Sequence, residues 1–204
     1  MIRLFKSKSN VGWKGNKPTD VVVGNFEKGF LKPGNSVLDV GCGFGRNANW
    51  LALKGLGVIG INVNDDEIQE ARKEAIKLGA KVEYLHADAI SLPFPNKTFD
   101  VVLDLGCSHM LSNKFSQQKA EKEAARVLKP NGYLIFFGFS KKHPSYVSNP
   151  GSPKFRDIKD IQDMYGRNFE IISSEETRWR PRPEENAKIR EHIGLNVLMQ
   201  KSAV

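Results

Sequence analysis

Residues 36–45 have the sequence Ser-Val-Leu-Asp-Val-Gly-Cys-Gly-Phe-Gly, in which a short run of mainly aliphatic side chains leads into three alternating glycines. A brief apolar run that ends at glycine is typical of a buried β-strand. Glycine has no Cβ, so the backbone beyond the strand turns tightly and a ligand comes within contact distance. These ten residues therefore predict a strand followed by a loop that binds a nucleoside cofactor.

The loop departs from the dinucleotide-binding pattern G-x-G-x-x-G at its third glycine. Gly45 comes one residue early, and Arg46 stands where that pattern has glycine. Asp39 leads into the loop, and a carboxylate suits a bound cation whereas it would repel a pyrophosphate. The early third glycine counts against an NAD-binding oxidoreductase, as does the absence of an acid at Asn62, and we keep this class as the third-ranked alternative.

The pattern D-x-G-x-G-x-G, which begins at Asp39, resembles motif I of the class I methyltransferases that use S-adenosylmethionine (SAM). The resemblance extends from about residue 24 to the end of the chain. It implies that the glycines pass under the methionine part of SAM and that Asp39 helps to bind its ammonium group. The cofactor-binding residues that it implies are Asp39, Gly41, Cys42, Gly43, Gly45, Asn47, Asn62, Val63, Asp88, Ala89 and Leu105.

A departure from the family pattern comes at residue 62. In the family an acid at this place accepts hydrogen bonds from both ribose hydroxyls, whereas this chain has Asn62. An amide oxygen accepts one such bond well but lacks the charge that strengthens a bidentate pair. We expect Asn62 to face the ribose and to bind it more weakly. Asp65 or Asp66 is the open alternative for the missing acid, although carboxylates there also suit the start of a helix.

Two later segments complete the resemblance. Residues 86–94 resemble the segment after strand three, which implies that Asp88 accepts a hydrogen bond from the adenine amino group and that the Ala89 amide faces a ring nitrogen. Residues 99–111 resemble motif IV and the loop where the methyl group leaves sulfur. Within them, residues 104–109 are most similar to the D-x-G-C-x-H form of small-molecule methyltransferases related to the tellurite-resistance and thiol-methylating groups.

Apolar β-type runs alternate with helical patterns along the chain, which predicts an α/β fold with a parallel sheet covered by helices on both faces. The resemblance implies a Rossmann-like, mostly parallel sheet of seven strands in the order 3-2-1-4-5-7-6, with the seventh antiparallel. We expect one domain over residues 1–204, in which residues 1–23 form an N-terminal cap and residues 24–204 the core. The expected strands are one from residue 36 and then 58–61, 82–85, 99–105, 133–139, 169–174 and 195–200; the expected helices are 18–31, 47–54, 65–78, 118–128 and 157–165.

The composition sets broad limits on the function. The chain has 204 residues, 40% of them hydrophobic, and 31 Lys and Arg against 23 Asp and Glu give a net charge of +8. This excess permits binding of RNA or acidic partners, but it is spread along the chain, as on a solvated surface. Only two cysteines occur, so no disulfide framework is implied and we expect a cytoplasmic location. We also expect no signal peptide, no membrane span and no metal site.

Methyl transfer from a sulfonium is an in-line displacement, so a base is needed only when the acceptor carries a proton. His109 follows the fourth expected strand and is the candidate base, because imidazole titrates near neutral pH. The alternative is that it only hydrogen-bonds within the wall of the site. His143 and Tyr146 follow the fifth expected strand and are candidates for contacting the acceptor. Trp13 is a further candidate, in a segment that either folds over the cofactor as a lid or packs against the sheet.

We therefore predict a SAM-dependent enzyme that methylates a small molecule and yields S-adenosylhomocysteine. No separate substrate domain is visible in the sequence, which favours a compact acceptor. RNA or protein methylation is an alternative. Trp179 with Arg178, Arg180 and Arg182 is the candidate contact for RNA or for an anionic acceptor, unless these residues only belong to the final hairpin. A module that binds SAM or S-adenosylhomocysteine without catalysis is the other alternative, and the oligomeric state is left open.

Overall fold

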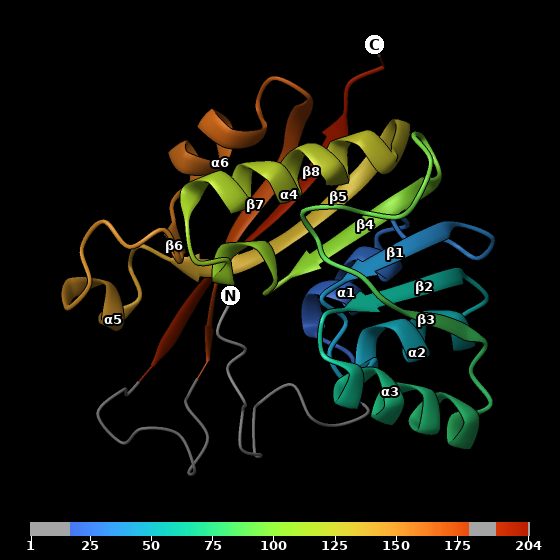
Figure 1. The fold of residues 1–204 in the computed structure, drawn as a ribbon. Helices are drawn as coiled ribbons and strands as arrows, with labels where there is room; N and C mark the ends of the chain where they lie inside the picture. Colours follow the sequence, from blue (N-terminus) through green and yellow to red (C-terminus); the bar gives the residue numbers. More distant parts are fainter. Residues whose placement is uncertain (1–16, 180–190, 204) are drawn as a thin grey trace.

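The computed structural model describes residues 17–179 and 191–203, which form one twisted sheet with helices packed on both faces (Figure 1). Trp13, Arg180 and Arg182 therefore lie outside the described residues. The elements in chain order are α1 (Asp20–Glu27), β1 (Ser36–Val40), α2 (Arg46–Leu53), β2 (Gly57–Asn62), α3 (Asp65–Leu78), β3 (Val82–His86), β4 (Phe99–Leu105), η1 (Ser108–Met110), α4 (Lys114–Val127), β5 (Leu128–Ser140), α5 (Pro144–Val147), β6 (Phe155–Arg156), α6 (Ile158–Tyr165), β7 (Phe169–Trp179) and β8 (His192–Lys201). In the described part of the chain, no helix is long and apolar enough to cross a membrane.

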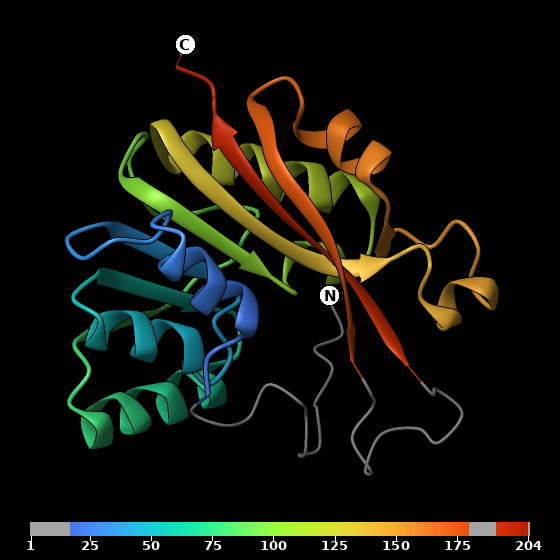
Figure 2. The same cartoon turned by 180° about the vertical axis from the view of Figure 1, so that it is seen from behind.

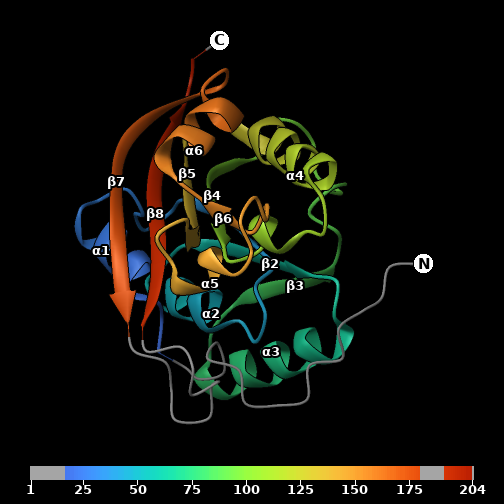
Figure 3. The same ribbon diagram turned by 90° about the vertical axis from the view of Figure 1, so that its left-hand side faces the viewer.

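The described sheet has eight strands, of which seven run side by side in the order β3-β2-β1-β4-β5-β8-β7. Strands β1 to β5 are parallel, whereas β8 runs antiparallel to both of its neighbours, β5 and β7. Strands β8 and β7 stand at one end of the sheet (Figure 3). The additional strand is β6, which has two residues and pairs with the end of β5. Without β6 the order matches 3-2-1-4-5-7-6 with an antiparallel seventh strand. The predicted arrangement is therefore confirmed, and the predicted strand count is one too low.

Helix α3 has the boundaries that the sequence predicted. Asn64 precedes it in an extended conformation, and its side-chain oxygen accepts hydrogen bonds from the backbone N–H groups of Asp66 (3.0 Å) and Glu67 (3.4 Å). Such a cap satisfies N–H groups that have no partner inside the helix. Gly79 ends the helix with a left-handed φ of 70°, which glycine adopts without strain. The fixed start of α3 holds the side chains of its first turn beside the end of β2.

Strand β5 is longer than the predicted segment 133–139. Leu128 already pairs with Phe99 of β4, after which the register shifts and residues 129–132 leave the ladder. The turn that the sequence predicted at 129–132 is therefore present as an interruption within the strand, and helix α4 ends directly before it.

Strand β7 also exceeds its predicted segment, 169–174, because β8 pairs with it along its length. The two strands stay paired as far as Trp179 and His192. Both rings lie against Phe139 near the end of β5, with centroid distances of 6.4 Å for Trp179 and 6.2 Å for His192. The longer hairpin thus adds aromatic side chains to the carboxyl end of the central strands.

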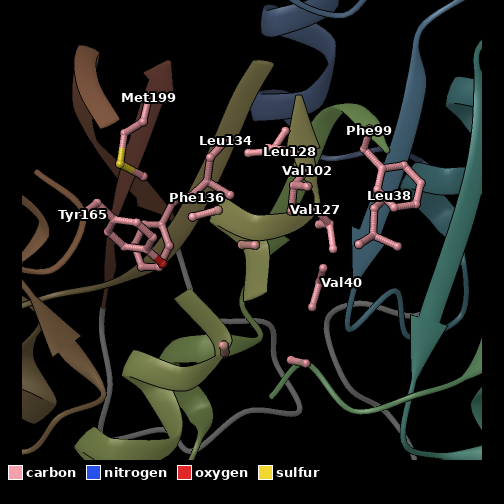
Figure 4. Packing of buried hydrophobic residues seen from close by; sticks show 14 of the residues in the cluster. Leu38, Val40, Phe99, Val102, Val127, Leu128, Leu134, Phe136, Tyr165 and Met199 are labelled. Carbon is pink, nitrogen blue, oxygen red and sulfur yellow. The ribbon is translucent and has the colours of Figure 1, made fainter. Parts of the chain in front are cut away.

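Alternating strand residues divide the core into two hydrophobic clusters, one on each face of the sheet. In β1, Leu38 belongs to the cluster that includes residues of α4 and α6, whereas Val37 belongs to the one that includes α1, α2 and α3. Figure 4 shows the first cluster, in which Phe136 of β5 packs near Tyr165 of α6. Figure 2 shows the three N-terminal helices on the opposite face. A core on both faces fixes the strand ends, from which the site is built.

Candidate active site

The parallel strands β1 to β5 end at the same edge of the sheet, where open α/β folds bind their ligands. Backbone hydrogen bonds tie the loops at this edge to neighbouring strands. The N–H of Cys42 donates to the carbonyl of Ile61 (2.9 Å), and the N–H of Ala87 donates to that of Asn62 (3.0 Å). The loops after β1, β2 and β3 therefore lie next to one another.

Two glycines of the loop after β1 are required by the packing around them. Gly41 has a left-handed φ of 70°, and a Cβ on it would lie 2.7 Å from both Cβ and Sγ of Cys107. Gly45 has a φ of 77°, and a Cβ on it would meet the hydroxyl of Tyr84. That hydroxyl is held in place because it donates a hydrogen bond to Oδ1 of Asn49 (2.8 Å). The loop thus lies directly against β3 and the segment after β4.

Asp39 is a buried carboxylate with one unpaired oxygen. The residue is 2% exposed, Oδ2 has no hydrogen-bond partner among the described residues, and the carboxylate accepts a bond from the N–H of Ala48. Burial raises the pKa of Asp39 to about 7, although Arg46 and the Ala48 N–H act in the opposite direction. A buried charge needs a partner. A ligand ammonium group would supply both the charge and the hydrogen bond, so the residues present fit the cation predicted at this place.

Two cysteines lie where the ends of three strands meet. Burial raises the pKa of the Cys107 thiol, and three carboxylates raise it further; they belong to Asp104, Asp88 and Asp39. Burial also raises the pKa of Cys42, and the charge of Asp39 adds to this effect. These interactions show that the acids from β1, β4 and the segment after β3 surround one place. A raised pKa also leaves both thiols protonated, so neither is a nucleophile here.

Asn47 and Asp88 fasten backbone segments at this edge. Oδ1 of Asn47 accepts hydrogen bonds from the N–H (2.9 Å) and the hydroxyl (3.2 Å) of Thr19, which ties the start of α1 to α2. Oδ1 of Asp88 accepts one from the N–H of Ile90 (3.1 Å). Ala89, which lies between Asp88 and Ile90, is buried. The second oxygen of Asp88 takes no hydrogen bond within the described residues, so it is available to a ligand.

The remaining predicted cofactor residues also lie at the carboxyl edge. Gly43 lies in the glycine loop with a left-handed φ of 55°. Val63 follows β2 and is exposed, whereas Leu105 ends β4 and is half-buried. The structure therefore brings the whole predicted set to one edge.

Asn62 ends β2 and uses both ends of its amide within the protein. Nδ2 donates a hydrogen bond to Oε2 of Glu67 (2.7 Å). Oδ1 accepts bonds from the backbone N–H groups of Val63 (2.8 Å) and Asn64 (3.4 Å). No sequence motif singled out Glu67. Its only signal was an acid in the first turn of the helix after Asn62.

His109 lies in the short helix η1 after β4 and is 3% exposed. Burial, followed by the charges of Arg156 and Lys154, lowers the pKa of His109 to about 3, so the imidazole is neutral at physiological pH. Its Nδ1 is buried without a hydrogen-bond partner among the described residues. The ring packs edge-on against Phe139, with 5.4 Å between centroids. His109 is therefore able to hydrogen-bond, but it is a weak base.

Buried polar side chains hold the loop that carries His109. Asp104 accepts a hydrogen bond from the N–H of Ser108 (2.9 Å). Nε2 of Gln117 donates to the carbonyl of His109 (3.4 Å), and Oε1 of Gln117 accepts a bond from Arg156 of β6. Helix α4 and strand β6 thus fix this loop through contacts that are distant in sequence.

His143 and Tyr146 lie after β5, as predicted, and both have partners within the protein. Nδ1 of His143 accepts a hydrogen bond from the N–H of Ser145 (3.0 Å), so in the neutral ring the proton is on Nε2, which donates to Nδ1 of His192 (2.8 Å). The Tyr146 hydroxyl accepts a bond from the N–H of Gly151 (3.3 Å). Both side chains therefore stabilise their own loop.

An aromatic group joins the two histidine-bearing loops. The ring of Phe139 contacts His109 at 5.4 Å and His143 at 4.9 Å between centroids. Trp179 stacks on His192 at 5.2 Å. Sequence motifs did not indicate His192, because its contacts come from β5 and β7, which are remote in the chain.

Arg178 belongs to the cluster considered for an anionic acceptor. Its guanidinium forms an exposed ion pair with Glu191 (2.9 Å). Its charge is thus already balanced within the protein, which lends no support to an RNA contact.

Comparison with known proteins identifies the domain. A family model described as a methyltransferase domain matches residues 38–136. A fatty-acid O-methyltransferase of Mycolicibacterium smegmatis is 38% identical over 105 residues, which cover 50% of this chain and 36% of the relative. A ubiquinone biosynthesis O-methyltransferase of Aliivibrio fischeri is 33% identical over 115 residues, which cover 56% of this chain and 48% of the relative. The chain thus spans about a third to a half of the length of these curated relatives.

The fold is shared with a solved SAM-dependent methyltransferase of Methanosarcina mazei. The two structures align with a TM-score of 0.72 over 88% of this chain and 98% of the other, at 23% identity. The matched domain contains the glycine loop and the ends of β1 to β4, where the buried Oδ2 of Asp39 lies without a partner among the described residues. Residues 38–136 thus form a methyltransferase domain, and the chain is similar in sequence and in fold to class I SAM-dependent methyltransferases.

Proposed function

We propose that this chain binds SAM at the edge formed by the loops after β1, β2 and β3 and transfers its methyl group to a small-molecule acceptor. The observation that carries this proposal is the buried Oδ2 of Asp39, which has no partner within the described residues. The ammonium group of SAM matches that atom in charge and in hydrogen bonding. A dinucleotide pyrophosphate would instead bring a second negative charge to the same place.

The other residues at the edge support the same cofactor. Gly41 and Gly45 keep the loop free of side chains where the backbone lies against Cys107 and Tyr84. Asp88 has a free acceptor oxygen for the adenine amino group. When bound, SAM would supply a methyl carbon on a sulfonium, which the acceptor would attack in line while the carbon–sulfur bond breaks and S-adenosylhomocysteine leaves.

The chain itself has to align the acceptor and exclude water. Phe139, half-buried near the end of β5, and the buried, neutral His109 after β4 pack together as a largely apolar surface. Nδ1 of His109 would hydrogen-bond the acceptor atom and orient it. Because the pKa of His109 is about 3, we assign it this orienting role rather than full removal of a proton.

The acceptor that we propose is an apolar small molecule with a hydroxyl or carboxyl oxygen. The aromatic side chains around Phe139 support the apolar character. Both curated relatives described above are O-methyltransferases, one of fatty acids and one of ubiquinone biosynthesis. These names support oxygen as the methyl acceptor.

Calorimetric titration of the purified chain with SAM, S-adenosylhomocysteine and NADH tests the cofactor assignment. We expect saturable binding of the two sulfur nucleosides, no binding of NADH, and weaker binding to Asp88→Ala. Binding of NADH alone would overturn the proposal.

A methyl-transfer assay with radiolabelled SAM then tests catalysis. Fatty acids and phenols would be offered as acceptors, alongside RNA and protein fractions. Transfer to a small molecule is the expected result. Transfer only to RNA or protein, or tight cofactor binding without transfer to any class, would contradict the proposed acceptor.

A further inference from the structure

On the basis of the function proposed above, we propose that Glu67 replaces the missing acid of the family and accepts hydrogen bonds from the ribose hydroxyls of the cofactor, with Asn62 as the residue that positions it. The acid is thereby displaced from the end of β2 to the first turn of α3.

The hydrogen bonds of Asn62 leave it poorly suited to bind a diol. Its Oδ1 already accepts two backbone N–H groups, those of Val63 and Asn64. Its Nδ2 donates to Oε2 of Glu67 at 2.7 Å. An amide oxygen has two acceptor sites, whereas a carboxylate has about four. Glu67 therefore retains acceptor capacity after Asn62 has bound one of its oxygens.

The carboxylate of Glu67 also lies beside the glycine loop. It is among the groups whose charge raises the pKa of Cys42, after burial, Asp39 and Cys107. The backbone agrees with this position, because the N–H of Cys42 donates to the carbonyl of Ile61, one residue before Asn62. Through Asn62, Glu67 is thus held near the loop that we assign to the cofactor.

The two aspartates that precede Glu67 are placed differently. The side chain of Asp65 is 71% exposed and pairs with Nδ1 of His86 at 2.8 Å. Asp66 is exposed as well, and its N–H is bound by the helix cap. Glu67 is half-buried, so it is the acid of this turn that is directed toward the site.

Calorimetry with S-adenosylhomocysteine and its 2′,3′-dideoxy analogue tests the assignment without requiring turnover. We expect Glu67→Gln to weaken binding of S-adenosylhomocysteine by about 10- to 100-fold, because a charged acceptor is lost. Binding of the dideoxy analogue should change by less than about threefold, since it offers no hydroxyls to the carboxylate. The exposed neighbour Asp66→Asn is the matched control and should leave both affinities unchanged.

A swapped pair tests the positioning role of Asn62. In the double variant Asn62→Asp, Glu67→Gln, an acid and an amide exchange places, and affinity for S-adenosylhomocysteine should recover to within about threefold of the parent. Thermal unfolding of each variant verifies that it folds. Equal weakening of both ligands by Glu67→Gln, or no recovery in the swapped pair, would overturn the assignment. Failure of the parent chain to bind S-adenosylhomocysteine would instead overturn the proposed function, and this assignment with it.

Discussion

The cofactor loops and the acceptor loops occupy the same edge of the sheet but are assembled in different ways. The loops after β1, β2 and β3 combine backbone hydrogen bonds with side-chain contacts at several ranges, from Asn62 and Glu67, five residues apart, to Tyr84 and Asn49, 35 residues apart. The loops after β4 and β5 depend on contacts across 39 residues, between Gln117 and Arg156, and across 49, between His143 and His192. Contacts between residues close in sequence thus contribute to the part that we assign to the cofactor. The part that we assign to the acceptor depends on the longer-range pairs.

The largest effect on stability is expected at Gly41, where the loop after β1 lies against Cys107 of the loop after β4. A Cβ there would lie 2.7 Å from Cys107, at a φ of 70°. Strain at positive φ and overpacking together predict that Gly41→Ala lowers the free energy of unfolding by about 2–5 kcal/mol, measured by urea denaturation. Gly34→Ala is the control, because Gly34 has a φ of 87° with no atom near the added Cβ, and it should lose only about 1–2 kcal/mol. Equal losses would mean that the contact with Cys107 is unimportant.

A substitution at Asp39 tests the electrostatics of the loops that we assign to the cofactor. Its pKa is raised from 3.8 to about 7 by burial, so the unfolded chain loses this proton at lower pH than the folded chain. The stability that the protonated carboxyl gives is complete below about pH 3.8 and is lost as the pH rises through 7. Between pH 5 and pH 7.5, the ligand-free parent should therefore lose about 3 kcal/mol more than Asp39→Asn. Parallel urea-denaturation results for the two proteins across this range would contradict the raised pKa.

The contrast between the two parts of the edge also explains which features could be predicted from the sequence. The boundaries of α3 were predicted from its helical pattern and from three acids in its first turn, and the structure adds a capping asparagine and a terminal glycine directly next to the segment. Asp39 and Gly41 belong to a motif whose function depends on adjacent residues. The positions of both followed from that motif, and the structure adds the unpaired oxygen of Asp39.

The acceptor side was harder to predict for a physical reason. Whether His109 is a strong or a weak base depends on burial and on the charges of Arg156 and Lys154, which arrive from another part of the chain. His192 contributes only because β7 and β8 are long enough to carry it to Phe139. Neither property is encoded in the residues next to these histidines.

A substitution at His109 should separate acceptor chemistry from cofactor binding. We expect His109→Asn to lower kcat/KM for the acceptor by about 10- to 100-fold, while the Kd for S-adenosylhomocysteine stays within twofold. Met110→Ala is the control, because the neighbouring Met110 is 49% exposed and should have little effect. With a pKa of about 3, His109 should add no step to the rate between pH 5 and pH 8. A step near pH 6.5 that disappears in His109→Asn would assign it the role of a base after all.

The smallest effect is expected at His192, where the long-range hydrogen bond with His143 is removed. His192→Phe keeps a ring next to Trp179 and Phe139 but leaves Nε2–H of the buried His143 without its acceptor. This loss should lower the free energy of unfolding by about 1–2 kcal/mol without changing the affinity for S-adenosylhomocysteine. In the control, His86→Phe, an exposed pair with Asp65 is lost, at a cost below about 1 kcal/mol. If His192→Phe weakened the binding of S-adenosylhomocysteine as well as the stability, the two parts of the edge would be coupled rather than independent.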